Sequence, residues 1–412
     1  MKKLAIIGSG IAGMASAYYL RDAYDIYVFE KDSRVGGHTN TIQLDDPAGP
    51  ISIDTGFIVH NPNNYPSFVK LIQDLGVETI ASDMSFSVYN RNINLQFAGE
   101  NLGSLFAQRR NIFSPRHLGL LLQANRFNKL APRHAISGKA DVSLGEYLSE
   151  NGYNEHFMQN FIFPMASAVW STPRSRINEF HAESFIRFFM NHGFLGLSGG
   201  REWRTIAGGS SEYMRKIQAA LKNPVRTSTP VHRVKRQGDG VVVQTGNGEA
   251  TFDKVILATH ADQALKLLSD ASDLEHATLR EFQYSKNIAT LHSDSRVMPP
   301  LKRIWASWNY KIEHHAEEAS SCTIYYMNRL QRLQTKTPYF VSINEIDSLD
   351  PEKVFAQIEY DHPIFNKETA AKQKTLSRLN EQGPVYFAGS YFGFGFHEDA
   401  LASALNVVRA LS

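Results

Sequence analysis

The segment Lys3-Leu4-Ala5-Ile6-Ile7-Gly8-Ser9-Gly10-Ile11-Ala12-Gly13 decides the fold of this 412-residue chain. A run of strand length leads into a Gly-x-Gly-x-x-Gly turn, and the breaker-free stretch 14–20 that follows is typical of a helix. In such a strand, turn and helix, Gly8 permits the tight turn, Gly10 lets the backbone approach a pyrophosphate, and Gly13 lets the helix pack closely on the strand. The N–H groups of Ile11 and Ala12 would then face the phosphates.

A second apolar run, 26–29, ends in Glu30, at a position where an acid can accept hydrogen bonds from a ribose. The strand, glycine turn, helix, second strand and acid together predict a Rossmann dinucleotide-binding unit. The alternative is a glycine-rich turn without a ligand.

The composition excludes several other classes of protein. With 42% hydrophobic residues the chain can form a sizeable core, and 43 Lys and Arg against 41 Asp and Glu argue against a nucleic-acid binder. The single cysteine, Cys322, allows no intrachain disulfide, and no metal site is predicted. No apolar run reaches the ~18 residues of a membrane-spanning helix, and the run after Lys3 is too short for a secretory signal, so we expect a cytoplasmic protein.

The residues after Glu30 indicate which dinucleotide is bound. The stretch Glu30-Lys31-Asp32-Ser33-Arg34-Val35-Gly36-Gly37-His38 resembles the second glycine motif of the flavin-containing amine oxidase superfamily, which also holds protoporphyrinogen oxidase and the carotenoid desaturases. The resemblance implies FAD as the cofactor, with Arg34 near the pyrophosphate or ribose and with Gly36 and Gly37 beneath the flavin. Lys31 and Thr39 are included among the cofactor-binding residues. The amine oxidases commonly have Arg where this chain has His38, for which we expect a polar contact rather than a covalent bond to the flavin.

Two internal segments resemble further cofactor-binding segments of the superfamily. Asp54-Thr55-Gly56-Phe57 resembles a glycine segment that lines the flavin. The region 225–259 reads as a β-meander followed by a strand, and resembles the pattern that meets the adenine and returns to the FAD sheet. The resemblance therefore implies five more cofactor-binding residues: Thr55, Gly56, Phe57, Val231 and Thr259.

The C-terminal segment resembles the last motif of the superfamily. A strand at 385–388 leads into a glycine-aromatic loop and a helix, with Asp399 as the expected N-cap. The helix N-terminus would face the flavin and stabilise negative charge on its reduced form. Ser390 replaces the usual acid, and Phe396 falls near the position of a cage aromatic in the amine oxidases. The residues predicted to bind the cofactor here are Gly389, Ser390, Glu398, Asp399 and Ala400.

The resemblance implies an α/β fold with a discontinuous, glutathione-reductase-like FAD-binding Rossmann domain and an inserted α+β substrate domain. The Rossmann domain is expected to comprise 1–80, 200–275 and 380–412. The substrate domain is expected to comprise 81–199 and 276–379.

The expected chemistry is C–H oxidation with hydride transfer to flavin N5. His397, beside Glu398 in the loop expected over the flavin, is the candidate general base, although a structural histidine in that loop is an equal alternative. Tyr391 and Phe396 are the other predicted catalytic-site residues, and Arg201 is a further candidate for the pocket. Many amine oxidases place a lysine beside flavin N5, and Lys286 and Lys302 lie in the relevant stretch.

Three short segments indicate one branch of the superfamily. They are Trp-Ala-Ser-Trp-Asn-Tyr at 305–310, Tyr-Met-Asn-Arg-Leu-Gln at 326–331 and Gly-Phe-Gly-Phe-His-Glu-Asp at 393–399. They are similar to bacterial NAD/FAD-binding proteins associated with cyclopropane-fatty-acyl synthase-like methyltransferases. That branch implies an acyl-lipid substrate that is desaturated or oxidised, and a lipid methyltransferase as a partner. A soluble amine oxidase and a non-redox flavoprotein that serves the methyltransferase are the two alternatives.

The segment 101–140 has an unusual charge pattern. It contains seven Lys and Arg residues and no acid, and leucines lie between the basic residues. A basic helix with an apolar face is typical of a segment that docks on anionic lipid, which would place the protein at the inner face of the membrane. The alternative is a solvated basic helix that packs on its own domain.

Overall fold

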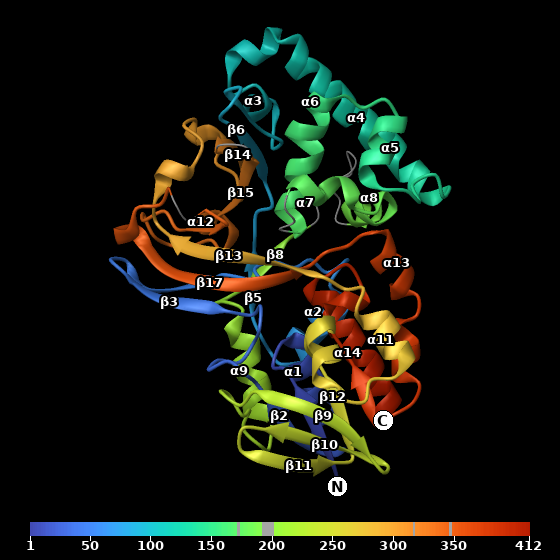
Figure 1. The fold of residues 1–412 in the computed structure, drawn as a ribbon. Helices are drawn as coiled ribbons and strands as arrows, with labels where there is room; N and C mark the ends of the chain where they lie inside the picture. Colours follow the sequence, from blue (N-terminus) through green and yellow to red (C-terminus); the bar gives the residue numbers. More distant parts are fainter. Residues whose placement is uncertain (171–173, 192–201, 316–317, 346–347) are drawn as a thin grey trace.

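The computed structural model describes residues 1–170, 174–191, 202–315, 318–345 and 348–412, which form two interleaved parts (Figure 1). The lower part in Figure 1 carries both chain ends, and the upper part is built from the insertions. The predicted fold class, a discontinuous Rossmann domain with an inserted α+β domain, is confirmed.

The centre of the lower part is a parallel sheet with strand order β18-β12-β1-β2. Its strands come from distant segments, namely β1 (Lys2–Ile7), β2 (Tyr24–Phe29), β12 (Lys254–Leu257) and β18 (Val385–Phe387). Residues 4–7 are almost fully buried because both faces of the sheet are covered. Leu4 and Ile6 pack in one core with α1 (Ile11–Leu20) and α14 (His397–Leu411), whereas Ala5 and Ile7 pack in another with the meander.

The predicted meander is present as an antiparallel sheet with strand order β11-β10-β9. Its strands are β9 (Val231–Gln237), β10 (Gly240–Thr245) and β11 (Gly248–Phe252). The remaining helices of the lower part are α2 (Pro66–Asp74), α9 (Ser211–Ala220), α10 (Ala261–Leu267), α11 (Asp273–Leu279), α13 (Lys367–Gln373) and the 3-10 helix η7 (Leu376–Asn380).

Two of the expected domain boundaries fall inside these helices. Leu279 of α11 and Leu376 and Leu379 of η7 pack in the meander core of the lower part. The segments 276–279 and 376–379 therefore lie with the Rossmann part, although they were expected in the substrate domain. The same correction applies to α13 (367–373), where Gln373 donates a hydrogen bond to the carbonyl oxygen of Tyr391 in the lower part. The boundary at 199/200 lies outside the described residues.

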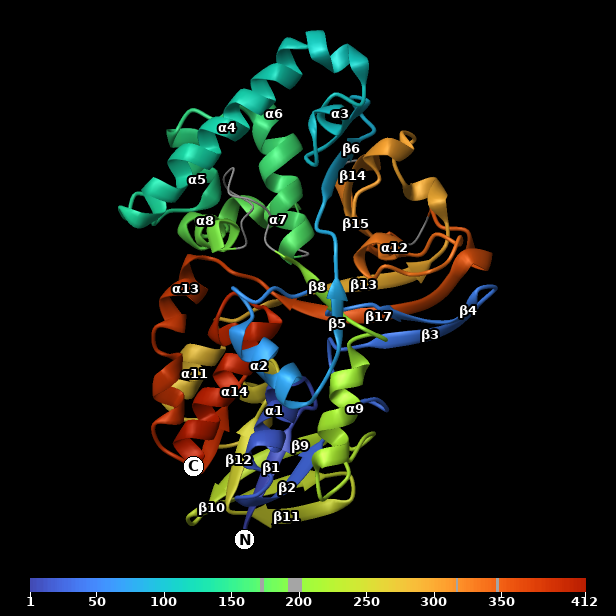
Figure 2. The same cartoon turned by 180° about the vertical axis from the view of Figure 1, so that it is seen from behind.

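The upper part contains a seven-stranded sheet with strand order β17-β13-β16-β15-β14-β6-β7, in which only the pair β14–β6 is parallel. The strands are β6 (Phe86–Asn90), β7 (Leu95–Ala98), β13 (Tyr284–His292), β14 (Trp308–His315), β15 (Glu318–Tyr326), β16 (Phe340–Ile343) and β17 (Val354–Pro363). The short helix α12 (Met327–Leu330) follows β15. The hairpin of β3 (Thr41–Asp46) and β4 (Gly49–Asp54) lies beside β17 in both views (Figure 2).

A helical cluster completes the upper part. Its members are α3 (Leu102–Leu105), the 3-10 helix η1 (Arg109–Phe113), α4 (Pro115–Ile136), α5 (Leu144–Glu150), α6 (Glu155–Phe157), α7 (Phe163–Trp170) and α8 (Ala182–Asn191). These helices share a core with β6, β7 and β14, in which Leu120 and Phe127 of α4 pack with Phe185 of α8. The chain passes between the two parts at β5 (Thr79–Ala81) and β8 (Arg204–Ile206), which pair with each other.

Candidate active site

A cavity of about 670 Å³ lies between the two parts. From the lower part it is lined by the first glycine turn, by Glu30 to His38, by 56–59, by 258–260 and by the loop before α14. From the upper part it is lined by α7, α8, β6, β14, β15 and β17. The sequence motifs that lie far apart along the chain therefore meet around one space.

The first glycine turn has the geometry of a phosphate cradle. Gly8 has φ +101°, and a Cβ there would lie 2.5 Å from the carbonyl oxygen of Ala258. A Cβ on Gly13 would lie 2.0 Å from the carbonyl oxygen of Gly8. A Cβ on Gly10 would meet nothing within 4 Å, because Gly10 borders the cavity. Packing thus requires Gly8 and Gly13, and the first N–H groups of α1 have no acceptor within the helix and can bind an anion.

Glu30 is held at the cavity wall by the turn it faces. Its Oε2 accepts hydrogen bonds from the backbone N–H (2.9 Å) and hydroxyl (2.6 Å) of Ser9, and its Oε1 accepts from the N–H of Asp32 (3.0 Å). The side chain is 7% exposed. The carboxylate is therefore fixed beside the cradle, where a ribose hydroxyl could donate to its remaining lone pairs. Lys31, Val231 and Thr259 line the cavity too.

Arg34 braces the second glycine motif. Its guanidinium donates to the carbonyl oxygens of Gly37 (2.7 Å) and Thr39 (3.4 Å). Gly36 and Gly37 both have positive φ, +126° and +58°, which explains the glycine pair. The loop formed in this way presents Arg34, Gly36, Gly37 and His38 to the cavity.

His38 presents unpaired polar atoms to the cavity. Its ring stacks on Tyr360 (centroids 4.8 Å apart) and meets His362 edge-on (5.4 Å). Neither ring nitrogen of His38 has a hydrogen-bond partner among the described residues. Burial holds the pKa of His38 well below its ordinary value, so the imidazole is neutral. A neutral ring with a free donor and a free acceptor is suited to the polar contact expected for this residue.

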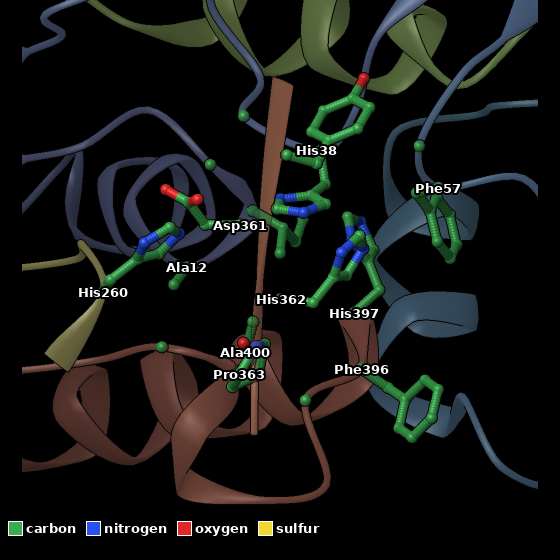
Figure 3. A pocket seen from close by; sticks show the side chains of 18 of the residues that line it. Ala12, His38, Phe57, His260, Asp361, His362, Pro363, Phe396, His397 and Ala400 are labelled. Carbon is green, nitrogen blue, oxygen red and sulfur yellow. The ribbon is translucent and has the colours of Figure 1, made fainter. Parts of the chain in front are cut away.

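His362, on β17, was not predicted. Its Nδ1 accepts a hydrogen bond from Nδ2 of Asn287 on β13 (2.9 Å), and Oδ1 of Asn287 accepts from Nδ2 of Asn344 (2.9 Å). Burial lowers the pKa of His362 to about 4, so its single proton is assigned to Nε2. Figure 3 shows His38, His362 and His397 gathered near Phe57, with His260 beside Asp361 farther away. The signal available in the sequence was the polar alternation of 357–363, which no motif distinguishes.

The side chain of His397 contacts other side chains of the protein on its ring face and at Nε2. Its ring stacks on Phe57 (3.8 Å, 9° between planes), and its Nε2 lies 2.8 Å from the hydroxyl of Tyr213, which is hydrogen-bonded to Oγ1 of Thr39. Burial lowers the pKa of His397 to about 3. A ring that is so hard to protonate is a poor general base, so this geometry supports the alternative, a structural histidine.

Glu398 and Asp399 support the loop rather than the cavity. Glu398 accepts hydrogen bonds from the N–H groups of Ser67 (2.8 Å) and Phe68 (2.9 Å) in the first turn of α2. The expectation that Asp399 is the N-cap is wrong, because Phe396 occupies that position. Asp399 instead accepts from the N–H groups of Phe394 and Phe396 (both 2.9 Å), and burial raises its pKa to about 6.

The other two predicted catalytic residues pack against aromatic rings of other elements. Tyr391 lines the cavity, but its ring packs on Phe282 (5.4 Å) in the meander core. Phe396 lines the cavity with its ring stacked on Phe188 (4.4 Å, 15°). Lys286 and Lys302 are exposed and do not line the cavity, and Arg201 lies outside the described residues.

Five of the residues predicted to bind the cofactor do not line the cavity: Gly13, Thr39, Thr55, Glu398 and Asp399. Their contacts are with other residues of the protein. Thr55, for example, is hydrogen-bonded (2.9 Å) to the hydroxyl of Tyr360, the ring on which His38 stacks. The predicted residues that do line the cavity are Gly8, Gly10, Ile11, Ala12, Glu30, Lys31, Arg34, Gly36, Gly37, His38, Gly56, Phe57, Val231, Thr259, Gly389, Ser390 and Ala400.

A phosphate cradle, a buried acid and a glycine-pair loop around one cavity, beneath an inserted domain, define a flavoprotein of the two-domain type. Residues 11–292 match the family model of the flavin-containing amine oxidoreductases. The chain belongs to this family, and its cofactor is FAD.

Known relatives agree with this assignment. The putative flavin-containing monoamine oxidase AofH of Mycobacterium tuberculosis is 26% identical over 269 residues, 62% of this chain and 56% of that protein. The match thus spans just over half of the length of that relative. The fatty acid isomerase from P. acnes that produces CLA has the same fold, with a TM-score of 0.70 at 14% identity over 99% of this chain and 98% of that one. Cyclohexylamine oxidase from Brevibacterium oxydans also has this fold, with a TM-score of 0.70 at 15% identity over 100% of this chain and 98% of that one.

Proposed function

We propose that the chain is an FAD-dependent oxidoreductase that desaturates an acyl chain or oxidises a similarly apolar substrate. The observation that carries the proposal is the wall that the upper part contributes to the cavity. The lining residues on β6, α7, α8, β14 and β15 are all uncharged, namely Phe86, Met165, Ala168, Val169, Phe188, Phe189, Trp308 and Tyr325. Such a wall binds an apolar chain through the hydrophobic effect and excludes water.

The charged groups of the upper part that do line the cavity lie elsewhere. They are Glu359 and Asp361 on β17, and Asp361 lies beside His260 (Figure 3). Within the described residues, none of the five elements that form the apolar wall contributes a carboxylate to the lining that could pair with a substrate ammonium. Burial of an unpaired charge is costly, so this distribution favours a neutral substrate.

The alternative of an amine oxidase requires two facing rings with space for the amine between them. Phe396, the ring expected in such a cage, is in stacking contact with Phe188 at 4.4 Å. No substrate can enter between rings in contact. The Phe188–Phe396 pair therefore acts as part of the apolar wall, which supports the acyl-chain proposal.

The protein's own residues hold and orient the reactants. FAD, held by the first glycine turn, Glu30 and the second glycine motif, would supply the two-electron oxidation in which a C–C bond becomes a C=C bond, with a hydride passing to the cofactor and a proton to the surroundings. The apolar wall aligns the chain, and the neutral imidazoles of His38 and His362 supply hydrogen-bonding groups without introducing charge. The fatty acid isomerase from P. acnes, which has the same fold, is named for an acyl substrate.

The test is anaerobic reduction of the purified flavoprotein. Phospholipid vesicles with saturated, unsaturated or methylated acyl chains and a panel of amines are mixed separately with the protein, and the visible flavin absorbance and the acyl products are followed, the latter by mass spectrometry. We expect bleaching by the lipids, with a product two mass units lighter. Bleaching by amines alone would indicate that the protein is an amine oxidase. Bound flavin that no substrate reduces, in a stable complex with a lipid methyltransferase, would support a non-redox partner role instead.

A further inference from the structure

The segments α3, η1 and α4 form the end of the molecule that lies farthest from the chain termini in both views (Figures 1 and 2). One side of α4 is fixed by packing, because Leu120, Phe127 and Ala131 are buried in the helical core. The opposite side of α4 faces outward, together with the exposed residues of α3, of η1 and of 137–139, whereas Asn111 of η1 is buried. We call this outward side the outer helical surface.

The outer helical surface exposes large apolar side chains. Phe113 is 86% exposed, Leu102 74%, Ile136 72% and Leu122 69%, and Ile112 and Leu118 are exposed as well. These six residues are more than half of the ten large hydrophobic residues that are exposed in the described structure, although they come from less than a tenth of its length. Soluble proteins scatter such residues singly, so their concentration at one end marks a contact site.

The same surface is purely basic. All seven Lys and Arg residues of 101–140 are exposed, and none of them forms an ion pair with a described residue; they are Arg109, Arg110, Arg116, Arg126, Lys129, Arg133 and Lys139. Arg110 and Arg126 donate to the backbone carbonyls of Asn94 and Asn151, which leaves their charges uncompensated. The surface therefore has no intramolecular counter-charge.

Apolar and basic residues share one stripe of α4. Leu118, Leu122, Arg126, Lys129, Arg133 and Ile136 recur at spacings of three or four residues and are all exposed. The buried residues of α4 occupy the other side of the helix. The exposed stripe therefore carries both apolar side chains, which can insert into an apolar phase, and basic side chains, which can pair with anions.

We propose that the outer helical surface docks on the surface of an anionic phospholipid bilayer. The apolar groups of η1 and α4 would enter the boundary between headgroups and acyl chains, and the basic groups would pair with lipid phosphates. A second copy of the chain is a poorer occupant, because a twofold contact would place the basic residues of the stripe against the same residues of the other copy. No described helix combines the length and hydrophobicity needed to cross a membrane. The inference rests on exposure and charge, and not on which substrate the cavity takes.

The experiment is co-sedimentation of the FAD-loaded full chain with vesicles of phosphatidylcholine alone or with added phosphatidylglycerol. We expect binding that requires the anionic lipid and weakens as salt is added. The variant Phe113→Ser/Leu122→Ser should bind at least ~10-fold more weakly, because the inserted apolar groups are lost. The variant Lys129→Gln/Arg133→Gln should lose roughly 5-fold per charge removed.

Matched controls are Phe355→Ser, an exposed Phe on β17, and Arg233→Gln/Lys235→Gln on β9 at the opposite end of the molecule. Both controls should bind like the wild type. Equal loss in test and control variants, or no binding of the wild type to anionic vesicles, would overturn the proposal. So would a wild-type dimer in solution that Phe113→Ser/Leu122→Ser dissociates. Because flavin reduction is not measured, a failure of the proposed acyl substrate would leave this result unaffected.

Discussion

Gly10 and Gly13 of the first turn differ in what a side chain would meet, the cofactor space in one case and the protein backbone in the other. Substitution of each glycine by alanine tests this difference. In Gly10→Ala the added methyl group points into the cavity and meets no protein atom. We expect the apoprotein to fold with a free energy of unfolding within ~1 kcal/mol of the wild type. FAD should bind far more weakly, because the methyl group occupies the space through which the pyrophosphate approaches the backbone. Flavin-fluorescence titration of the apoprotein and urea unfolding give the two quantities.

Gly13→Ala is the contrasting variant, because its methyl group would lie 2.0 Å from the carbonyl oxygen of Gly8. The helix α1 must shift away from β1 to admit it, which should cost at least 1–3 kcal/mol of folding free energy. FAD binding is then lost together with stability. If Gly10→Ala were destabilised as much as Gly13→Ala, or still bound FAD normally, the phosphate cradle would be misplaced.

At the scale of one helix, Asp399 organises the start of α14. Its carboxylate is the acceptor for two backbone N–H groups of the loop 394–396, which borders the cavity. Asp399→Ala leaves both groups without that acceptor, and we expect a loss of about 1–3 kcal/mol in the free energy of unfolding at pH 7, with weaker FAD binding. Chemical denaturation and flavin titration measure the two effects.

Asp399→Asn is the control for this prediction, because its amide oxygen can still accept a hydrogen bond. Burial raises the pKa of Asp399 to about 6, so the wild-type side chain is largely neutral at pH 5. The stability of Asp399→Asn should therefore approach that of the wild type at pH 5. A stable Asp399→Ala protein with normal FAD affinity would contradict the assigned role.

The elements whose signals are local could be predicted from the sequence. The strand, turn and helix at 2–20 and the meander at 231–252 follow from apolar runs and turn residues that act over a few positions. The N-cap of α14 was placed wrongly because Asp399 is as compatible with the third helical position as with the cap, and only the loop geometry distinguishes the two. Likewise, the expected domain boundaries cut α11 and η7 because packing in the meander core, and not a local signal, assigns these segments to the lower part.

At the scale of the whole molecule, the interleaving of the two parts explains which site residues could not be predicted from the sequence. The glycine motifs could be found because one ligand imposes their pattern along a short stretch. His362 faces the cavity only because β17 pairs with β13, which brings Asn287 to its Nδ1 across 75 residues of sequence. A histidine on an alternating strand has no such pattern, so its role depends on long-range contacts that the sequence does not display.

The same burial of histidines makes the stability of the whole molecule depend on pH. The pKa values of His60, His292 and His362 are lowered to about 4 and that of His397 to about 3. Below the ordinary pKa of 6.5, therefore, these histidines are protonated in the unfolded chain but not in the native protein. As a result, the free energy of unfolding decreases as the pH is lowered. Asp54 and Asp399, with pKa values raised to about 6, act in the opposite sense, because the native protein binds their protons first.

His38, whose pKa is also held well below its ordinary value, adds a fifth such histidine. Five histidines against two carboxyl groups leave an excess of roughly three protons on the unfolded chain near pH 5, a loss on the order of 4 kcal/mol per pH unit. Urea unfolding of the apoprotein at pH 7, 6 and 5 measures this slope. His292→Gln isolates one contribution, because His292 does not line the cavity and is fully buried between Ser342 and the N–H of Asp294. Its slope should be shallower by roughly 1.4 kcal/mol per pH unit, the value for one proton. A stability that stays level or rises from pH 6.5 to 5 would mean that the native protein can protonate these histidines in place.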